Sequence, residues 1–299
     1  MSPNAGKHAK NDTDCQGVLV VGCGYLGSRV AAAVKQSGDK VWTTTRSEQR
    51  ASQWKQSGFE PIVLDWTDRR TLQSIPQVNR VLVAVSYDRT SQLSRHESQV
   101  GGLQNLLAKI SPSANVCYIS TTGVFHQTDG QWVDENSPAE PTREGGRAHL
   151  DAESALRECR GDAPWSILRL SGIYGPDRVP RAADVIAGRP IRSPQEGYLN
   201  LIHVDDAVQA VLASWQRQQQ RLYLISDDKP VVRRDFYQEI AVQCNAEAPT
   251  FESPDSDAPV SMRSNSNKRI RNQRMKQELV SELQYPTYRD GLRDVLSNT

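Results

Sequence analysis

The sequence lacks any apolar run long enough to cross a membrane, because such a span needs about 18 to 20 consecutive apolar residues. Its opening stretch, MSPNAGKHAKNDTD, also lacks the apolar core of a secretory signal. These two absences favour a cytoplasmic protein that makes no membrane contact.

An excess of charge is lacking as well, since 36 Lys and Arg residues stand against 35 Asp and Glu residues. Global charge therefore attracts neither nucleic acid nor an anionic surface, and a small molecule is the expected partner. The one basic stretch, RSNSNKRIRNQRMK at 263–276, contains no aromatic residue on which a base can stack. We expect it to form a solvated helix face and predict no nucleic-acid partner.

The cysteines lack the spacing of a metal or disulfide motif. They are odd in number and none forms a C-x-x-C pair, which predicts free thiols. Asp205 and Asp206 begin an expected helix, where they are better explained as N-terminal caps than as metal ligands. We therefore expect no metal site. The five cysteines are Cys15, Cys23, Cys117, Cys159 and Cys244.

A glycine-rich turn, GCGYLG at 22–27, directly follows the apolar run GVLVV at 17–21. Apolar residues four apart then predict an amphipathic helix, which Gly38 can end. In such a strand–turn–helix unit Gly22 permits the tight turn, Gly24 lets the backbone approach a pyrophosphate and Gly27 allows close packing of helix on strand. The motif predicts dinucleotide binding at the helix start, and a purely structural glycine turn is the alternative.

Short β-branched runs alternate with helical patterns along the rest of the chain. This alternation implies parallel strands with right-handed crossovers, and hence an α/β fold with a doubly wound Rossmann sheet. The further strands are expected at 40–46, 61–65, 80–86, 115–121, 164–170 and 221–228.

The end of the second expected strand bears on the choice of cofactor. An NAD site usually has an acidic residue about 20 positions after the glycines, whereas an Arg there can receive a 2′-phosphate. This chain has Thr45 and Arg46, so NADP is preferred over NAD. Alternatively, Arg46 is a solvated residue that opens the next helix. Asp65 is expected near the adenine amino group, or else as a turn or cap residue.

Three segments carry a resemblance to a known family: YISTTGVF at 118–125, LRLSGIYGP at 168–176 and LIHVDDAVQAV at 201–211. They resemble segments of the extended short-chain dehydrogenases/reductases, the NAD-dependent epimerase/dehydratase family. Taken together, GRAHLDAE at 146–153, RLSGIYGP at 169–176 and the tail YPTYRDGL at 285–292 are most similar to the atypical, YeeZ-like subgroup. The resemblance covers about residues 17–296.

The resemblance implies a Rossmann sheet of about seven strands and a small C-terminal α+β lobe that holds the substrate. We expect a disordered tail at 1–15 and a dinucleotide-binding domain at 16–176, to which 200–228 returns. The substrate lobe is expected to consist of 177–199 and 229–299.

The resemblance also indicates what is missing. In working members of the family, the helix after the fifth strand carries Tyr-x-x-x-Lys, in which the Tyr transfers a proton and the Lys lowers its pKa. Aligned by Pro141 and Glu153, these positions fall on Gly145 and His149. A positioned acid or base is worth about 10²- to 10⁴-fold, so the usual mechanism does not carry over. The candidates to replace the Tyr are Tyr87, Tyr174, Tyr198, His149 and His203.

Other parts of the family's site remain. Thr121, with Thr122 beside it, stands at the position of the catalytic Ser/Thr, where a hydroxyl either bonds a substrate oxygen or only satisfies a turn. The residues expected to contact the cofactor are Gly22, Gly24, Tyr25, Leu26, Gly27, Arg46, Ser47, Asp65, Val85, Ser86, Ser171 and Gly172. Three basic residues near the expected substrate mouth suggest either an anionic ligand or an ordinary charged surface: Arg181, Arg189 and Arg192.

Two functions are consistent with these features. The first is an NADP(H)- or NAD(H)-dependent oxidoreductase or epimerase/dehydratase-like enzyme acting on a small polar, nucleotide- or phosphate-bearing substrate. The second is a non-catalytic NADP(H)-binding redox sensor. The retained LRLSGIYGP motif and Thr121 favour the first, whereas the missing Tyr and Lys favour the second.

Overall fold

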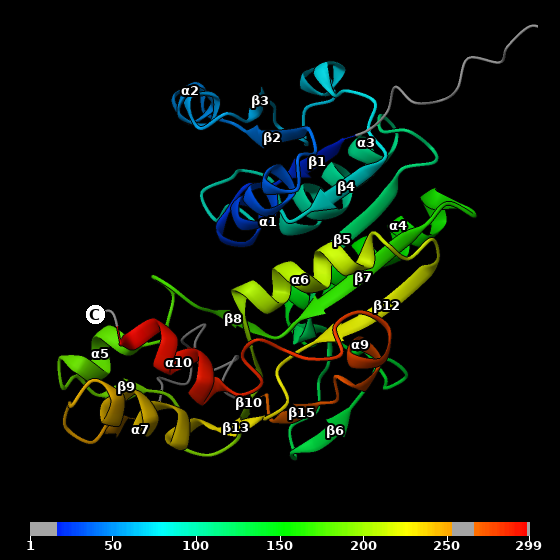
Figure 1. Cartoon of the computed structure of the whole chain (residues 1–299). Helices are drawn as coiled ribbons and strands as arrows, with labels where there is room; N and C mark the ends of the chain where they lie inside the picture. The colour runs from blue at the N-terminus through cyan, green and yellow to red at the C-terminus, as the bar shows by residue number, and fades with distance from the viewer. Residues whose placement is uncertain (1–16, 253–265, 298–299) are drawn as a thin grey trace, which may run out of the picture.

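Seven parallel strands form the central sheet of the computed structural model, which describes residues 17–252 and 266–297 (Figure 1). Their order, β12-β7-β5-β4-β1-β2-β3, confirms the predicted doubly wound sheet, and each strand lies within three residues of its expected bounds. The strands are β1 (Val18–Val21), β2 (Val41–Thr45), β3 (Glu60–Val63), β4 (Arg80–Val83), β5 (Asn115–Thr121), β7 (Trp165–Leu170) and β12 (Gln220–Ile225).

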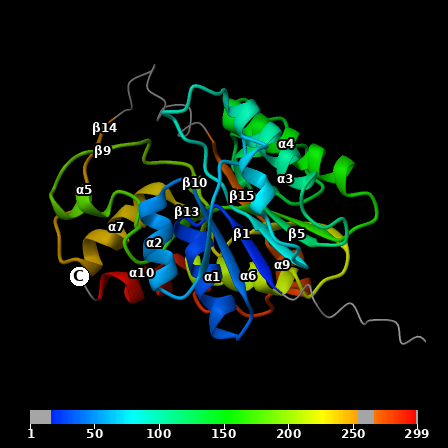
Figure 2. The ribbon, with the colours of Figure 1, turned by 90° about the horizontal axis from the view of Figure 1, so that it is seen from above.

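Helices cover both faces of this sheet, as Figure 2 shows from above. On one face α1 (Tyr25–Gln36) packs beside α6 (Val204–Ser214), with α2 (Glu48–Gln56) near the β3 edge. On the other face α3 (Gly102–Leu107), which a π-helical turn at Glu97–Gly101 precedes, packs beside α4 (Glu144–Arg160). Because both faces are covered, the central strand β1 is entirely apolar and all four of its residues are buried.

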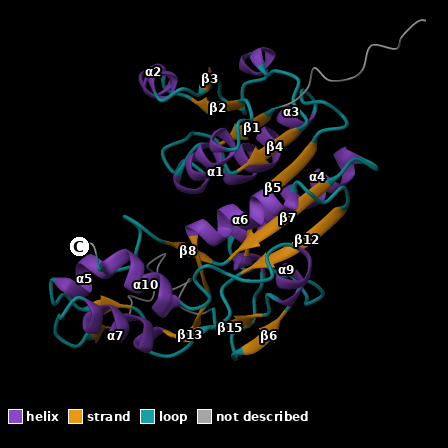
Figure 3. Ribbon diagram, in the orientation of Figure 1, coloured by secondary structure: helices purple, strands orange, loops and turns teal. Residues whose placement is uncertain are grey.

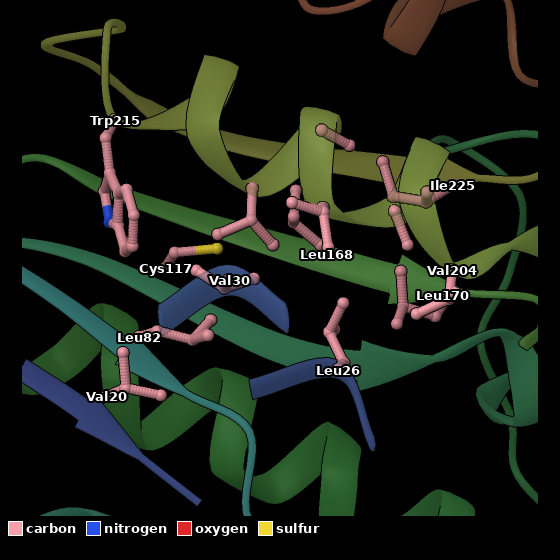
Figure 4. Close-up of a cluster of buried hydrophobic side chains, with 14 of the residues drawn as sticks. Val20, Leu26, Val30, Leu82, Cys117, Leu168, Leu170, Val204, Trp215 and Ile225 are labelled. Carbon is pink, nitrogen blue, oxygen red and sulfur yellow. The ribbon is translucent and has the colours of Figure 1, made fainter. Parts of the chain in front are cut away.

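Two apolar clusters hold the helices to the sheet. In the first, Val20 and Leu82 of the sheet meet Leu26 and Val30 of α1, and Trp215 closes one end (Figure 4). In the second, Leu103 and Leu156 pack against the opposite face. Fully burying each large aliphatic side chain stabilises the fold by roughly 1.5–3 kcal/mol, so these clusters dominate its stability.

The remaining elements gather below the sheet in Figure 1, and a separate apolar cluster among them includes Tyr174, Phe236 and Tyr288. Figure 3 shows both short strands and helices there. The helices are α5 (Ala182–Ile186), α7 (Arg233–Gln243), α9 (Gln273–Glu278) and α10 (Tyr288–Leu296). The paired strands are β8 (Gly172–Tyr174) with β11 (Leu201–His203), β9 (Ile191–Arg192) with β14 (Phe251–Glu252), β10 (Tyr198–Leu199) with β13 (Val231–Val232), and β6 (Gln131–Val133) with β15 (Lys268–Ile270).

Two connections cross between these elements and the sheet. Strand β15 pairs with β6, which lies between β5 and α4 in the chain. Met275 of α9 and Leu283 belong to the apolar cluster of the sheet. The expected domain boundaries stay a prediction, and the expected tail at 1–15 lies outside the described residues.

The basic stretch is not the solvated helix face that we expected. Within its described part, Lys268–Ile270 forms β15, and a helix begins only at Gln273. This strand pairs with β6, and the side chain of Asn200 also holds it, because its amide donates to the carbonyl of Lys268 while its oxygen accepts from the N–H of Ile270. Lys268 is only 5% exposed.

The prediction that the paired aspartates cap α6 is also wrong. The cap is His203, whose ring nitrogen accepts from the N–H of Asp205. Asp206 is buried and accepts from the backbone N–H groups of Gln284 and Tyr285 at 2.7 and 3.0 Å, so it anchors the C-terminal segment instead. A contact between residues almost eighty positions apart leaves no local signal in the sequence.

Free thiols are confirmed for the four cysteines of the described part, and Cys15 lies outside it. In the same part of the chain, no helix is both long and apolar enough to span a bilayer.

Candidate functional site

A cleft of about 290 Å³ opens at the carboxyl ends of β1, β2, β3 and β4. Ligands of doubly wound sheets bind at this edge, where the strand order reverses on either side of β1. Six of the residues predicted to contact a cofactor line this one cleft: Gly22, Gly24, Arg46, Asp65, Val85 and Ser86. The fold therefore brings together residues that are up to 64 positions apart.

The three glycines of the turn meet different surroundings. Gly22 has a φ of +92°, and a Cβ there would lie 2.5 Å from the carbonyl oxygen of Ala84. A Cβ on Gly27 would collide with the carbonyl of Gly22. A Cβ on Gly24 would meet no atom within 4 Å, and its φ of −84° suits any residue. The fold thus requires glycine at 22 and 27, whereas glycine at 24 only keeps the space above the turn open.

The start of α1 faces that open space. Gly24 is its N-cap and has no side chain to offer, the first turn has no acidic residue, and the first helical bond runs from Ser28 N–H to Gly24 O. The preceding amides, with the helix dipole, form a ready site for an anion. Two side chains of this turn point elsewhere: Leu26 packs in the core, and the Tyr25 hydroxyl donates to the carbonyl of Pro176.

The far end of the cleft is basic. Arg46, directly after β2, and Arg50, one helical turn later, both line it. Ser47 was predicted to contact the cofactor. Its hydroxyl is the N-cap of α2, where it accepts a hydrogen bond from the N–H of Arg50. We did not anticipate Arg50 from the sequence.

Two carboxylates accompany these arginines. Asp65 accepts from the N–H and the hydroxyl of Thr67, as a turn residue does, and its side chain still lines the cleft. Asp88, from the loop after β4, pairs with Arg46 at 2.7 Å. Hydrogen bonds from Thr90, followed by the bond from Arg46, lower the pKa of Asp88 to about 2. Nothing in the sequence around Asp88 predicts this pairing.

The ends of β5 and β7 lie outside this cleft. Thr121 is half-buried and its Oγ1 accepts from Gly123 N–H, whereas the buried Thr122 hydroxyl donates to the carbonyl of Leu170. Ser171 is buried, and no hydrogen-bond partner of its hydroxyl occurs among the described residues. The N–H of Gly172 donates to Asn200 O.

The first turns of α4 contain the two positions that the family resemblance assigns to Tyr and Lys. At Gly145, a Cβ would lie 3.7 Å from the guanidinium of Arg95, which also covers the ring of Tyr87 at 4.2 Å. At His149, the ring Nδ1 is hydrogen-bonded to the buried Tyr118 hydroxyl at 2.9 Å. Burial lowers the pKa of His149 to about 4, so the ring is neutral near pH 7.

The other candidates for proton transfer are held by packing. Tyr174 and His203 are fully buried and lie edge to face, and burial lowers the pKa of His203. The hydroxyl of Tyr87 donates to Leu93 O. Tyr198 packs under the guanidinium of Arg269. None of the four lines the cleft.

A buried ion pair fixes α4 to the sheet beneath this region. Glu153 is fully buried and receives two hydrogen bonds from Arg169 of β7, at 2.9 and 2.7 Å. Ser120 donates to the same carboxylate at 2.6 Å. Such a bidentate pair holds the helix at a defined height on the sheet.

The three arginines suggested for an anionic ligand each have a carboxylate partner. Arg181 and Arg189 both pair with Asp184, and Arg192 lies 3.6 Å from Glu252. These pairs match the charged-surface alternative. Among the described residues, no three His, Cys, Asp or Glu side chains converge as metal ligands would.

Comparisons with known proteins agree with this fold. The chain is 25% identical over 277 residues to the protein YeeZ of Escherichia coli strain K12, covering 90% of this chain and 96% of that one. It is 26% identical over 232 residues to a 4-hydroxy-2-methyl-3-oxo-4-farnesyl-3,4-dihydroquinoline-1-oxide ketoreductase of Stigmatella aurantiaca, covering 72% and 69% of the two chains.

A solved structure of UDP-glucose 4-epimerase from Thermotoga maritima, with UDP-glucose, superposes with a TM-score of 0.80. It covers 94% of this chain and 97% of the other, and at 16% identity it shows a common fold. The sequence profile of the NAD dependent epimerase/dehydratase family matches residues 18–226, which include the whole central sheet. The chain belongs to the NAD-dependent epimerase/dehydratase family and has its NAD(P)-binding fold.

Proposed function

We propose that the chain binds a nicotinamide dinucleotide in the cleft at β1–β4, and that it prefers NADP to NAD. The observation that carries this proposal is the contrast among the glycines: Gly22 and Gly27 are needed by the fold, whereas Gly24 leaves room only for something outside the chain. The open space adjoins the uncapped start of α1, which suits a diphosphate.

The residues present fit both ends of such a cofactor. The amides at the start of α1 hold the diphosphate, and Val85 and Ser86 border the cleft on the side of β4. Arg46 and Arg50 supply two positive charges where a 2′-phosphate would lie, and guanidinium groups bind phosphate bidentately. The carboxylate of Asp65 accepts from its own turn and lies within the same cleft, where an adenine amino group can donate to it.

We further propose that the protein is an oxidoreductase or an epimerase/dehydratase-like enzyme acting on a small polar, nucleotide-linked substrate. The nicotinamide supplies hydride chemistry when bound, and the chain positions the substrate oxygen. Thr121 suits this role because its Oγ1 accepts from Gly123 N–H, so its own proton remains available to a substrate oxygen. Ser171 and Gly172 would line the nicotinamide side of the site.

A specific observation favours a second candidate, a non-catalytic NADP(H)-binding redox sensor. The positions of the proton donor and its lysine hold Gly145 and a neutral His149. Arg95 lies against Gly145, and a guanidinium does not release a proton near neutral pH. A site of this kind can bind a cofactor, but it has no side chain suited to transferring a proton to or from a substrate.

The experiment that separates these functions begins with calorimetric titration of the purified chain with NADPH and NADH. Polar carbonyl compounds are then screened for oxidation of the bound cofactor, and nucleotide sugars for conversion to a new product by chromatography, because an epimerase or dehydratase regenerates its cofactor in each cycle. Turnover of any of them supports the enzyme, and tight NADPH binding without turnover supports the sensor. If neither dinucleotide binds, both candidates are refuted.

A further inference from the structure

Arg46, the residue that favours NADP, already has a carboxylate partner. Its Nη2 lies 2.7 Å from Oδ2 of Asp88. The other oxygen of Asp88 accepts from the N–H and the hydroxyl of Thr90 at 2.9 and 2.7 Å. These two bonds hold the carboxylate in place, so Oδ2 is presented to Arg46 by a preformed turn.

The pair spans the cleft. Arg46 follows β2 and Asp88 follows β4, and β1 with its glycine turn lies between these two strands in the sheet. Both side chains line the cleft, as do Ser91 and Leu93 from the same loop as Asp88. The ion pair therefore joins the β4 loop to β2 at the place where the adenosine ribose would lie.

A carboxylate at this place treats the two cofactors differently. A 2′-phosphate that approaches Arg46 must displace Asp88 or lie beside its negative charge, and either event weakens binding. A ribose 2′-hydroxyl can donate to the same carboxylate and leave the ion pair intact. Asp88 would thus do from β4 what an acidic residue at the end of β2 does in an NAD site.

We infer that Asp88 is a specificity-determining residue, which opposes the preference of Arg46 for the 2′-phosphate and so sets the ratio of NADP to NAD binding. This inference rests on the proposed function, since it concerns the same cleft. It is independent of whether the protein is an enzyme or a sensor, because it concerns cofactor affinity alone.

The test is the substitution Asp88→Asn, which removes the charge and keeps the size and the Thr90 contacts. The matched control is Asp39→Asn: Asp39 pairs with Arg80 at 2.8 Å and is exposed to the same degree, but this pair joins the opposite ends of β2 and β4. Dissociation constants for NADPH and NADH are measured by calorimetry on the full chain, with thermal unfolding to verify folding.

We expect Asp88→Asn to tighten NADPH about three- to tenfold and to leave NADH within twofold or weaken it, because exposed charge pairs are modest in strength. In an Arg46→Ala background the gain should largely disappear. An unchanged ratio of the two dissociation constants in Asp88→Asn, or an equal change in Asp39→Asn, would overturn the inference and leave the proposed function standing. Failure of the native chain to bind either dinucleotide would overturn both.

Discussion

Substituting Gly24 separates the role of the glycine turn in folding from its role in binding. In Gly24→Val, the new Cβ meets no atom within 4 Å and the backbone φ of −84° is negative, as in ordinary L-residues. Valine is a poorer N-cap than glycine, which lowers the stability of the fold. It also reduces the conformational entropy of the unfolded chain, which stabilises the fold by about 0.4–1 kcal/mol. These effects oppose one another, so the free energy of unfolding should change by less than about 1 kcal/mol.

Binding should respond very differently. The valine would occupy the space above the start of α1, and the backbone amides there could no longer reach a diphosphate. Each charge-assisted hydrogen bond contributes about 1.5–3 kcal/mol, so the loss of two weakens binding about 10²- to 10⁴-fold. The loss should be equal for NADPH and NADH, because both carry the same diphosphate.

The assay combines calorimetric titration with urea denaturation. Gly27→Ala is the matched control, since its Cβ collides with the Gly22 carbonyl and overpacking typically costs 1–3 kcal/mol. We therefore expect lost affinity with retained stability for Gly24→Val, and lost stability for Gly27→Ala. A Gly24→Val protein that is folded and binds both dinucleotides with native affinity would refute the assignment of the turn.

Three further predictions concern other parts of the site. Arg46→Ala should weaken the binding of NADPH about tenfold or more and that of NADH less than twofold in the same titration, because a charged contact to the 2′-phosphate is lost. Equal weakening of both would refute the assignment of Arg46 to the 2′-phosphate. Glu153→Ala should lower the free energy of unfolding by about 3–5 kcal/mol in urea, because it leaves the buried Arg169 unpaired, whereas the exposed Glu158→Ala should change it by less than about 0.5 kcal/mol. Folding lowers the pKa of His149 from 6.5 to about 4, so the unfolded chain binds more protons between these values and stability falls as the pH drops through this window. His149→Asn should remove up to about 3 kcal/mol of that fall between pH 7 and 4, measured by denaturation, and an unchanged pH dependence would contradict the burial of a neutral ring.

The fold class and the glycine turn were predictable because local interactions encode them. Alternating β-branched runs and amphipathic patterns depend on neighbours within a few positions, and the seven strands lie close to their expected bounds. Gly22 needs a positive φ for the turn itself, whatever surrounds it. The family resemblance, carried by short motifs at strand ends, is confirmed by the profile match over residues 18–226.

The two wrong predictions, for the basic stretch at 263–276 and for the aspartates at the start of α6, concern segments that contact distant parts of the chain. Lys268–Ile270 pairs with β6 and is also bonded by the Asn200 side chain, and Asp206 binds the backbone at Gln284, so neither outcome follows from local propensity. Tertiary contacts of this kind commonly override the intrinsic preference of a short segment.

The candidate site divides in the same way. The sequence by itself determined the glycine turn, Arg46 and Asp65, because each is tied to the end of a strand whose position follows from local pattern. Only the tertiary structure decided that Asp88 faces Arg46 and that Arg95 lies against Gly145. The physical reason is that a parallel sheet brings together the ends of strands that are far apart in the chain. Charged residues that follow these strands therefore become neighbours, and their spacing in the sequence does not predict the pairing.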